Sequence, residues 1–153
     1  MTIYRLAQQP HLAAQTAALM TVIWPSHYGP DGDGDAMVDV QNRIAEDRAA
    51  ITVKDDTVVG TVALDANSFG SQGEGPWLVG LCTSPHCRGQ GIATALTTWA
   101  MGSAHQEGHA ALFATTKEAA GIMRRLGWRR MRQITDQSGT WTVWRVMLSG
   151  PRA

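Results

Sequence analysis

The chain has 153 residues, and its 13 basic and 13 acidic side chains give a formal net charge of zero. That length suits a single domain with a hydrophobic core, which we expect to span residues 1–153. Zero net charge argues against nucleic acid or an anionic membrane as a partner, because both attract a broad basic surface.

The first half of the chain predicts a strand, two helices and a hairpin. Apolar residues recur at helical spacing in both helical segments, and Pro25 is expected to end the first. The hairpin strands are rich in β-branched residues, and Asp55 and Asp56 form the turn between them. These elements are expected at residues 3–6 (strand), 11–24 and 36–47 (helices), and 50–53 and 58–64 (strands).

The segment between the two predicted helices ends in three aspartates that alternate with glycine, from Asp31 to Asp35. This spacing resembles the start of a calcium loop, which also needs glycine at its sixth and glutamate at its twelfth position. Ala36 and Asn42 stand at those positions. We therefore expect a flexible acidic loop that caps the following helix, and no calcium site.

The second half of the chain predicts strands that alternate with helices. A Gly/Ser-rich loop at 67–76 precedes a central strand, and Gly127 stands where a helix is expected to end. The order is mixed α/β, with an antiparallel front and one βαβ crossover behind it. These elements are expected at residues 77–83 (strand), from a glycine-rich turn to about 106 (helix), 111–114 (strand), 117–126 (helix), and 128–134 and 140–148 (strands).

That glycine-rich turn, Arg88-Gly89-Gln90-Gly91-Ile92-Ala93, is the most informative feature of the sequence. The first backbone N–H groups of a helix have no intrahelical partner, and the helix dipole adds partial positive charge at the same end. The two glycines remove the side chains that would block a close approach. The turn therefore predicts an anion cradle suited to a pyrophosphate.

Two other nucleotide-binding motifs fit the turn less well. A P-loop needs a Gly-Lys pair, and the chain has none. A dinucleotide fingerprint needs a third glycine or an alanine, and that position falls on Thr94. Taken alone, the turn leaves open a helix that merely begins with glycines.

Several other patterns bear on metals, phosphates and location. His105 and His109 stand four residues apart, but Gly108 interrupts their helix, so we expect no metal. Five arginines between residues 124 and 132 form either a solvated face or a clamp for cofactor phosphates.

Cys82 and Cys87 form no disulfide framework, and we find neither a signal-peptide core nor a membrane-length apolar run. A cytoplasmic protein is therefore expected.

The chain resembles the Gcn5-related N-acetyltransferase (GNAT) family. Its cofactor motif, Arg/Gln-x-x-Gly-x-Gly/Ala, is satisfied by Arg88, Gly91 and Ala93. The preceding Leu81-Cys82-Thr83-Ser84-Pro85 resembles the strand end before that motif, and Arg125-Leu126-Gly127-Trp128 resembles the family's Leu-Gly-Phe/Trp signature. The resemblance implies an α/β (α+β) fold with a central mixed, mostly antiparallel twisted sheet of about six to seven strands and about four helices.

The resemblance implies an acyltransferase that uses acetyl-CoA, or another acyl-CoA, and a primary amine of a small molecule or peptide. Backbone N–H groups of the turn would hold the pyrophosphate, and the edge of the central strand would pair with the pantetheine and offer an N–H to the oxyanion. The implied cofactor-binding residues are Leu81, Cys82, Thr83, Arg88, Gly89, Gln90, Gly91, Ile92, Ala93, Thr94 and Thr116.

The sequence departs from the family pattern at two positions. Met123 stands where many members have a tyrosine that protonates the leaving CoA thiolate, and Thr116 stands where an asparagine often touches the cofactor. Methionine has no proton to give, and a positioned acid is typically worth about 10²–10⁴-fold. Either another group completes the reaction, or the protein is an acyl-CoA-binding module with weak or no catalysis.

An attacking amine must lose a proton, so a base is expected near the acceptor. The candidates are Glu74, before the central strand, and His27 with Tyr28, in the loop that lines the acceptor pocket in this family. Tyr28 is also a candidate proton donor to the thiolate. Trp24 and Trp77 are expected to flank the acceptor pocket, where they suit either an aromatic or apolar acceptor or a cation, and the aspartates of the acidic loop favour a cationic amine. The sequence leaves the oligomeric state open, and pairing of terminal strands in a homodimer is compatible with this fold.

Overall fold

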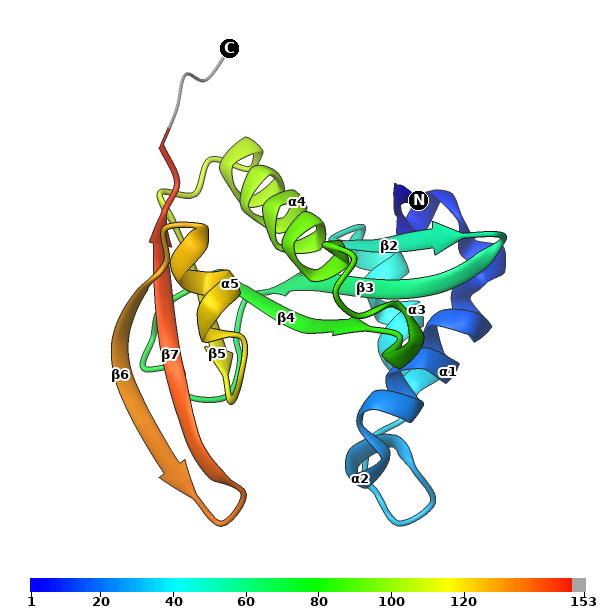
Figure 1. The fold of residues 1–153 in the computed structure, drawn as a ribbon, viewed down its shortest axis with the longest axis horizontal. Coiled ribbons are helices and arrows are strands. Elements are labelled where there is room, and N and C mark those ends of the chain that lie inside the picture. The colour runs from blue at the N-terminus through cyan, green and yellow to red at the C-terminus, as the bar shows by residue number, and fades with distance from the viewer. Residues whose placement is uncertain (150–153) are drawn as a thin grey trace. The chain divides into compact units, whose positions relative to one another are not determined.

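A computed structural model describes residues 1–149 of the chain. Within that range, the strands and helices follow one another largely in the order that the sequence predicts (Figure 1). The strands are β1 (Thr2–Arg5), β2 (Ala49–Lys54), β3 (Thr57–Asp65), β4 (Trp77–Thr83), β5 (Ala111–Thr116), β6 (Arg129–Asp136) and β7 (Gly139–Met147). The helices are α1 (Ala13–Ile23), α2 (Pro25–Tyr28), α3 (Ala36–Glu46), α4 (Ile92–Gln106) and α5 (Ala120–Arg125), with 3-10 turns η1 (Leu6–Gln8), η2 (Pro10–Leu12) and η3 (Pro85–Cys87).

The strands form one seven-stranded sheet in the order β1-β2-β3-β4-β5-β7-β6. β4 and β5 are parallel, whereas β1 with β2, β2 with β3, β5 with β7 and β6 with β7 are antiparallel. The predicted mixed, mostly antiparallel sheet is thus confirmed. The described chain divides into two compact units, the first made of residues 1–63 and 80–97 and the second of residues 64–79 and 98–149.

The first unit has a core of fully buried apolar side chains from helices and strands that the periodicity predicted. Its largest members are Leu6, Met20, Val40, Ile51, Val62, Ile92 and Leu96. The acidic loop caps α3 as expected, because Asp35 Oδ1 accepts a hydrogen bond from the Val38 N–H at 3.1 Å. The hairpin between β2 and β3 turns at Asp55 and Asp56, whose φ angles of 51° and 62° suit a tight turn.

The second unit is built on β5, β6 and β7. Trp77, Phe113 and Val143 form a buried cluster on one face of this part of the sheet. The Gly/Ser-rich loop crosses this unit and is held by side chains from the strands. Thr115 Oγ1 donates to the Phe69 carbonyl at 2.6 Å, and the Phe69 and Trp141 rings meet edge to face at 5.5 Å.

Three helix boundaries differ from the sequence-based expectation. The helix expected at 11–24 begins at Ala13, because residues 10–12 form the 3-10 turn η2. Pro25 does end α1, but it also occupies the first position of α2, where a missing N–H costs nothing. The helix expected at 117–126 begins only at Ala120, because Ala119 has a left-handed backbone with φ of 74°. Its end is as predicted, since Gly127 follows with φ of 86°. No helix within residues 1–149 is long and apolar enough to cross a membrane.

Candidate active site

The glycine-rich turn links β4 to α4, as the sequence predicts. η3 follows the end of β4 and leads to Arg88, which is extended. Gly89 and Gly91 then adopt left-handed conformations, with φ of 79° and 78°. These two residues direct the chain into α4, whose first residue, Ile92, is buried. Side chains strain such conformations, which explains the need for glycine at both positions.

The turn offers backbone donors and open space. The first backbone hydrogen bond into α4 runs from the Ala95 N–H to the Gly91 carbonyl, at 3.0 Å. Within the described part of the chain, the amides from Gly89 to Ala93 donate to no backbone carbonyl. A Cβ added to either glycine would meet no atom of a non-adjacent residue within 4 Å. The turn therefore fits an anion that approaches the backbone closely.

The segment of β4 just before the turn contains a kink and a buried thiol. Gly80, in the middle of the strand, has φ of 62°, a conformation typical of a glycine bulge. Cys82 follows it and is buried, and this burial raises the pKa of its thiol to about 12. The thiol is therefore neutral near pH 7 and a poor nucleophile.

The two positions that depart from the family pattern lie in the second unit. Thr116, at the end of β5, accepts a hydrogen bond from Trp144 Nε1 at 2.8 Å, and its own hydroxyl proton remains a donor. Met123, on α5, is fully buried in the core. Its backbone carbonyl accepts a hydrogen bond from the Trp128 N–H at 3.0 Å, at the C-terminal end of the helix. Met123 thus has a packing role.

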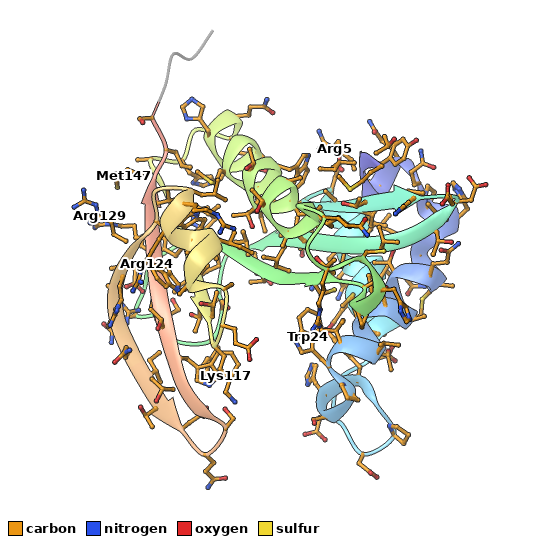
Figure 2. The ribbon with its side chains drawn as sticks, in the orientation of Figure 1. Arg5, Trp24, Lys117, Arg124, Arg129 and Met147 are labelled. Carbon is orange, nitrogen blue, oxygen red and sulfur yellow. The ribbon has the colours of Figure 1, made fainter. Side chains whose placement is uncertain are left out.

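α2 brings His27 and Tyr28 together, with ring centroids 4.5 Å apart. Trp24, just before α2, lies 6.4 Å from the Tyr28 ring (Figure 2). Tyr28 Oη donates to Asp39 Oδ2 on α3 at 2.6 Å, so a hydrogen bond ties the two helices together. His27 is exposed, and its backbone carbonyl accepts from the Gly34 N–H at 2.8 Å. The acidic loop is thereby closed onto α2.

The environment of Tyr28 makes it a weak acid. Burial, and then the hydrogen bond to the Asp39 carboxylate, raise the pKa of Tyr28 to about 12. A thiol has a reference pKa of about 8.5, so proton transfer from this phenol to a thiolate would be uphill. The geometry favours Tyr28 as a group that orients α2 over its predicted role as a proton donor.

Glu74 is held in an ion pair within the second unit. Its carboxylate accepts from Arg132 Nη1 at 2.6 Å and Nη2 at 3.0 Å, and from the Gln72 N–H at 2.7 Å. Arg132 Nη2 also donates to the Gly70 carbonyl at 2.6 Å. The hydrogen bond from Arg132 is the main reason that the pKa of Glu74 falls to about 2. So strongly stabilised a carboxylate is a poor proton acceptor, and the geometry favours Glu74 as a clasp that holds its loop.

The five arginines between residues 124 and 132 do not act as one group. Arg132 belongs to the clasp just described, and the Arg124 guanidinium lies 6.0 Å from the centre of the Trp144 ring (Figure 2). Arg129, on β6, faces Arg145 across the β6–β7 ladder. The two line a shallow hollow together with Gly127 and Met147. Among residues 1–149, no group of three or more His, Cys, Asp or Glu side chains is placed to hold a metal ion.

Comparison with known proteins agrees with this geometry. The sequence profile of the acetyltransferase (GNAT) family matches residues 16–128, which include the glycine-rich turn and the Leu-Gly-Trp segment. The chain belongs to this family. The GNAT membership and the GNAT-like fold expected from the motifs are both confirmed. No curated protein matches the sequence.

Solved GNAT structures share the fold at low sequence identity. The chain is 16% identical to the aminoglycoside 6'-N-acetyltransferase from Enterococcus faecium, with all of both chains covered and a TM-score of 0.80. A second aminoglycoside 6'-N-acetyltransferase, complexed with coenzyme A, is 14% identical over all of both chains with a TM-score of 0.80. A putative acetyltransferase from Salmonella typhimurium, solved with its cofactor acetyl-CoA, is 17% identical, with 100% of this chain and 96% of that chain covered and a TM-score of 0.73.

The GNAT tyrosine cannot simply be restored at position 123. Met123→Tyr would force a larger ring and an unpartnered hydroxyl into a core in which Met123 is 0% exposed. We expect a loss of about 1–3 kcal/mol of unfolding free energy and no gain in rate. Thermal denaturation and CoA release would measure both. Met131→Tyr, at a methionine that is 38% exposed, is the matched control and should be neutral. A faster, equally stable Met123→Tyr enzyme would contradict the packing role.

The Glu74–Arg132 clasp predicts a specific acid sensitivity. Because the pKa of Glu74 is lowered from 4.5 to about 2, its stabilising effect is complete above about pH 4.5 and is lost as the pH falls towards 2. We expect the melting temperature of the native protein to fall more steeply over that range than that of Glu74→Gln. Circular dichroism melts between pH 2 and pH 7 test this, with Glu118→Gln, an exposed glutamate of the same unit, as the control. Parallel curves for native protein and Glu74→Gln would refute the clasp.

Sequence reasoning missed three residues near the candidate site of this GNAT protein. Asp39 and Arg43 are polar positions on α3, and their pattern showed only that they lie off its apolar stripe. Gly80 did carry a signal, since a glycine inside a strand often marks a bulge or a close approach. In the structure a Cβ at Gly80 would lie 2.5 Å from Arg43 Nη2. The glycine is therefore required by its backbone conformation, with φ of 62°, and Arg43 occupies the space beside it.

Proposed function

We propose that this GNAT protein is an N-acetyltransferase that moves an acetyl group from acetyl-CoA to a primary amine of a small molecule or peptide. The observation that carries the proposal is the turn at the start of α4. Gly89 and Gly91 have left-handed backbones and no side chains that would block the turn. The amides from Gly89 to Ala93 have no backbone acceptor within residues 1–149. These groups would bind the pyrophosphate of acetyl-CoA, whose thioester supplies the activated acetyl group.

We propose that Leu81, Cys82 and Thr83 bind the pantetheine arm, and that Arg88 to Thr94 and Thr116 complete the cofactor contacts. Thr116 keeps a hydroxyl proton for this purpose, because in its bond with Trp144 it is the acceptor. The buried, neutral thiol of Cys82 is unsuited to carry the acetyl group as an enzyme-bound thioester. This supports direct transfer from the thioester to the amine.

We propose that the amine substrate binds at α2 and that His27 accepts its proton. His27 is exposed beside Tyr28, and an imidazole suits this role near neutral pH. Glu74 remains a candidate base from the sequence, but its ion pair with Arg132 argues against it. Two of the structural relatives are named as aminoglycoside N-acetyltransferases, so amino sugars belong among the acceptors to be tested.

The alternative is an acyl-CoA-binding module with weak or no catalysis. Two observations favour it: Met123 is buried in the core, and the pKa of Tyr28 is raised to about 12. Neither group is suited to protonate a thiolate. Water can do so, because a thiolate with a reference pKa of about 8.5 is a tolerable leaving group near neutrality. For that reason we prefer the enzymatic proposal.

The experiment that separates the two proposals measures free CoA with a thiol-reactive dye while acetyl-CoA binding is measured by calorimetry. The amine panel contains amino sugars, amino acids, their carboxamides, peptides and aromatic amines. Acetyl-CoA binding with CoA release on at least one class of amine supports the enzyme. Binding without release on any amine supports the module, and the absence of binding contradicts both.

We also propose that the protein works in the cytoplasm. Both cysteines, Cys82 and Cys87, are free thiols, as expected in a reducing compartment. Homodimer formation through a terminal strand remains a prediction from the sequence. Light scattering of the purified protein would test it.

A further inference from the structure

The first unit contains a half-buried guanidinium group that faces the kink of β4. Arg43 projects from α3, and a Cβ added to Gly80 would lie 2.5 Å from Arg43 Nη2 and 3.0 Å from Cζ and Nη1. The guanidinium group therefore occupies the space that a side chain at position 80 would fill. Its charge also lowers the pKa values of both Tyr28 and Cys82, so it lies within electrostatic reach of α2 and of β4.

Arg43 is half-buried, and it makes no hydrogen bond to a strong acceptor of the protein. A guanidinium has five N–H donors in a planar fork, yet the hydrogen bond that Arg43 makes goes to Met20 Sδ, a weak acceptor, at 3.6 Å. Within the described range, no carboxylate lies within ion-pair distance of it. Asp39 stands one helical turn before it on α3 but accepts its hydrogen bond from Tyr28. The N–H groups of Arg43 that make no hydrogen bond are open to solvent, so the anionic group of a ligand can reach them.

We infer that Arg43 binds a carboxylate on the acceptor substrate, so that the preferred acceptors are amines that also carry an acid group, such as amino acids or the C-terminal residue of a short peptide. This inference rests on the proposed function, because it places the acceptor beside α2 and the kink of β4. The planar fork of arginine matches a carboxylate with two parallel hydrogen bonds. An amino sugar without a carboxylate would gain nothing from Arg43.

The test compares amines that differ only in the acid group. Each amino acid is paired with its carboxamide, and kcat and KM are measured for the native protein, Arg43→Gln, Arg43→Lys and Arg5→Gln. Arg5 lies in the same unit and pairs with Asp47. Arg5→Gln therefore also removes one positive charge, but at a position other than Arg43. We expect the native protein to favour each acid over its carboxamide by about 10- to 100-fold in kcat/KM, the range for a charge-assisted contact.

Arg43→Gln should remove this preference by raising KM for the acids while KM for the carboxamides and the affinity for acetyl-CoA stay unchanged. Arg43→Lys, which keeps the charge but not the fork, should retain part of the preference, and Arg5→Gln all of it. Equal use of acids and carboxamides by the native protein, or an undiminished preference in Arg43→Gln, would overturn the assignment.

Failure of the proposed function gives a different result. If acetyl-CoA binds but CoA is released with none of the amines, the transferase proposal is wrong. Calorimetric titration of each amino acid and its carboxamide into the protein–CoA complex then still tests whether Arg43 binds the carboxylate. The inference is supported if the acids bind to the native protein and Arg43→Gln weakens that binding. Binding that is equal for acids and carboxamides, or absent for both, overturns it.

Discussion

Gly91→Val is expected to lose acetyl-CoA binding by about 100-fold, or about 2.7 kcal/mol, while the protein stays folded. Gly91 has φ of 78° at the start of α4, and a Cβ there would project into space that is free of non-adjacent atoms within 4 Å. A valine side chain would occupy the space that a pyrophosphate needs to reach the amides. Isothermal titration calorimetry with acetyl-CoA measures the loss directly.

Gly73→Val is the matched control. Gly73 also has a positive φ, 100°, and also has no non-adjacent atom within 4 Å of a built Cβ, but it lies in the loop before β4. Both variants should carry a similar backbone strain of about 1–3 kcal/mol. If both lose affinity equally, the effect is general destabilisation. If Gly91→Val binds acetyl-CoA as tightly as the native protein, the cradle assignment is wrong.

Gly60→Val is expected to disturb both stability and cofactor binding. Gly60 is a buried residue of β3, and a Cβ there would lie 2.7 Å from Ile92 Cγ2, 3.0 Å from Leu96 Cδ1 and 3.3 Å from the Cys82 carbonyl oxygen. α4 therefore starts in close contact with this glycine. Overpacking of this kind costs typically about 1–3 kcal/mol and moves the backbone. Because Ile92 begins α4, the displaced turn should bind acetyl-CoA about tenfold more weakly or worse.

Gly102→Ala, in α4, is expected to have the opposite effect on stability. A Cβ at Gly102 meets nothing within 4 Å, so alanine should raise the stability by about 0.5–1 kcal/mol and leave acetyl-CoA affinity unchanged. Thermal melts and calorimetry on both variants separate packing from helix propensity. Unchanged stability and affinity in Gly60→Val would show that α4 does not depend on the contact with β3.

The sequence was sufficient for the elements that local signals control. Helical periodicity predicted α1, α3 and α4, the Asp55-Asp56 turn predicted the β2–β3 hairpin, and Gly127 predicted the end of α5. Asp35 acts as the predicted cap. These signals depend on residues that are neighbours along the chain, so they can be interpreted without tertiary information.

Other features depend on choices that local signals leave open. Proline both ends a helix and begins one, so the position of Pro25 did not predict α2. Alanine is a good helix former, yet Ala119 adopts a left-handed backbone just before α5. The late start of α5 therefore had no signal in its own residues.

The chemistry of the candidate site depended most on contacts between distant residues. The turn from Gly89 to Ala93 was predictable, because its signal is a short motif that precedes a helix. The ion pair between Glu74 and Arg132 joins residues 58 positions apart, and it lowers the pKa of the carboxylate that the sequence suggested as a base. The placement of Arg43 against Gly80 likewise requires the fold.

The central claim is that the backbone amides at the start of α4 bind the pyrophosphate of acetyl-CoA. Titration of the ¹⁵N-labelled protein with CoA, followed by amide NMR, tests it most directly. We predict saturable shifts of the Gly89, Gly91 and Ile92 amide signals, whereas the Gly73 signal stays in place. Saturation of CoA binding with these three signals unmoved, and with shifts confined to other segments, would contradict the claim.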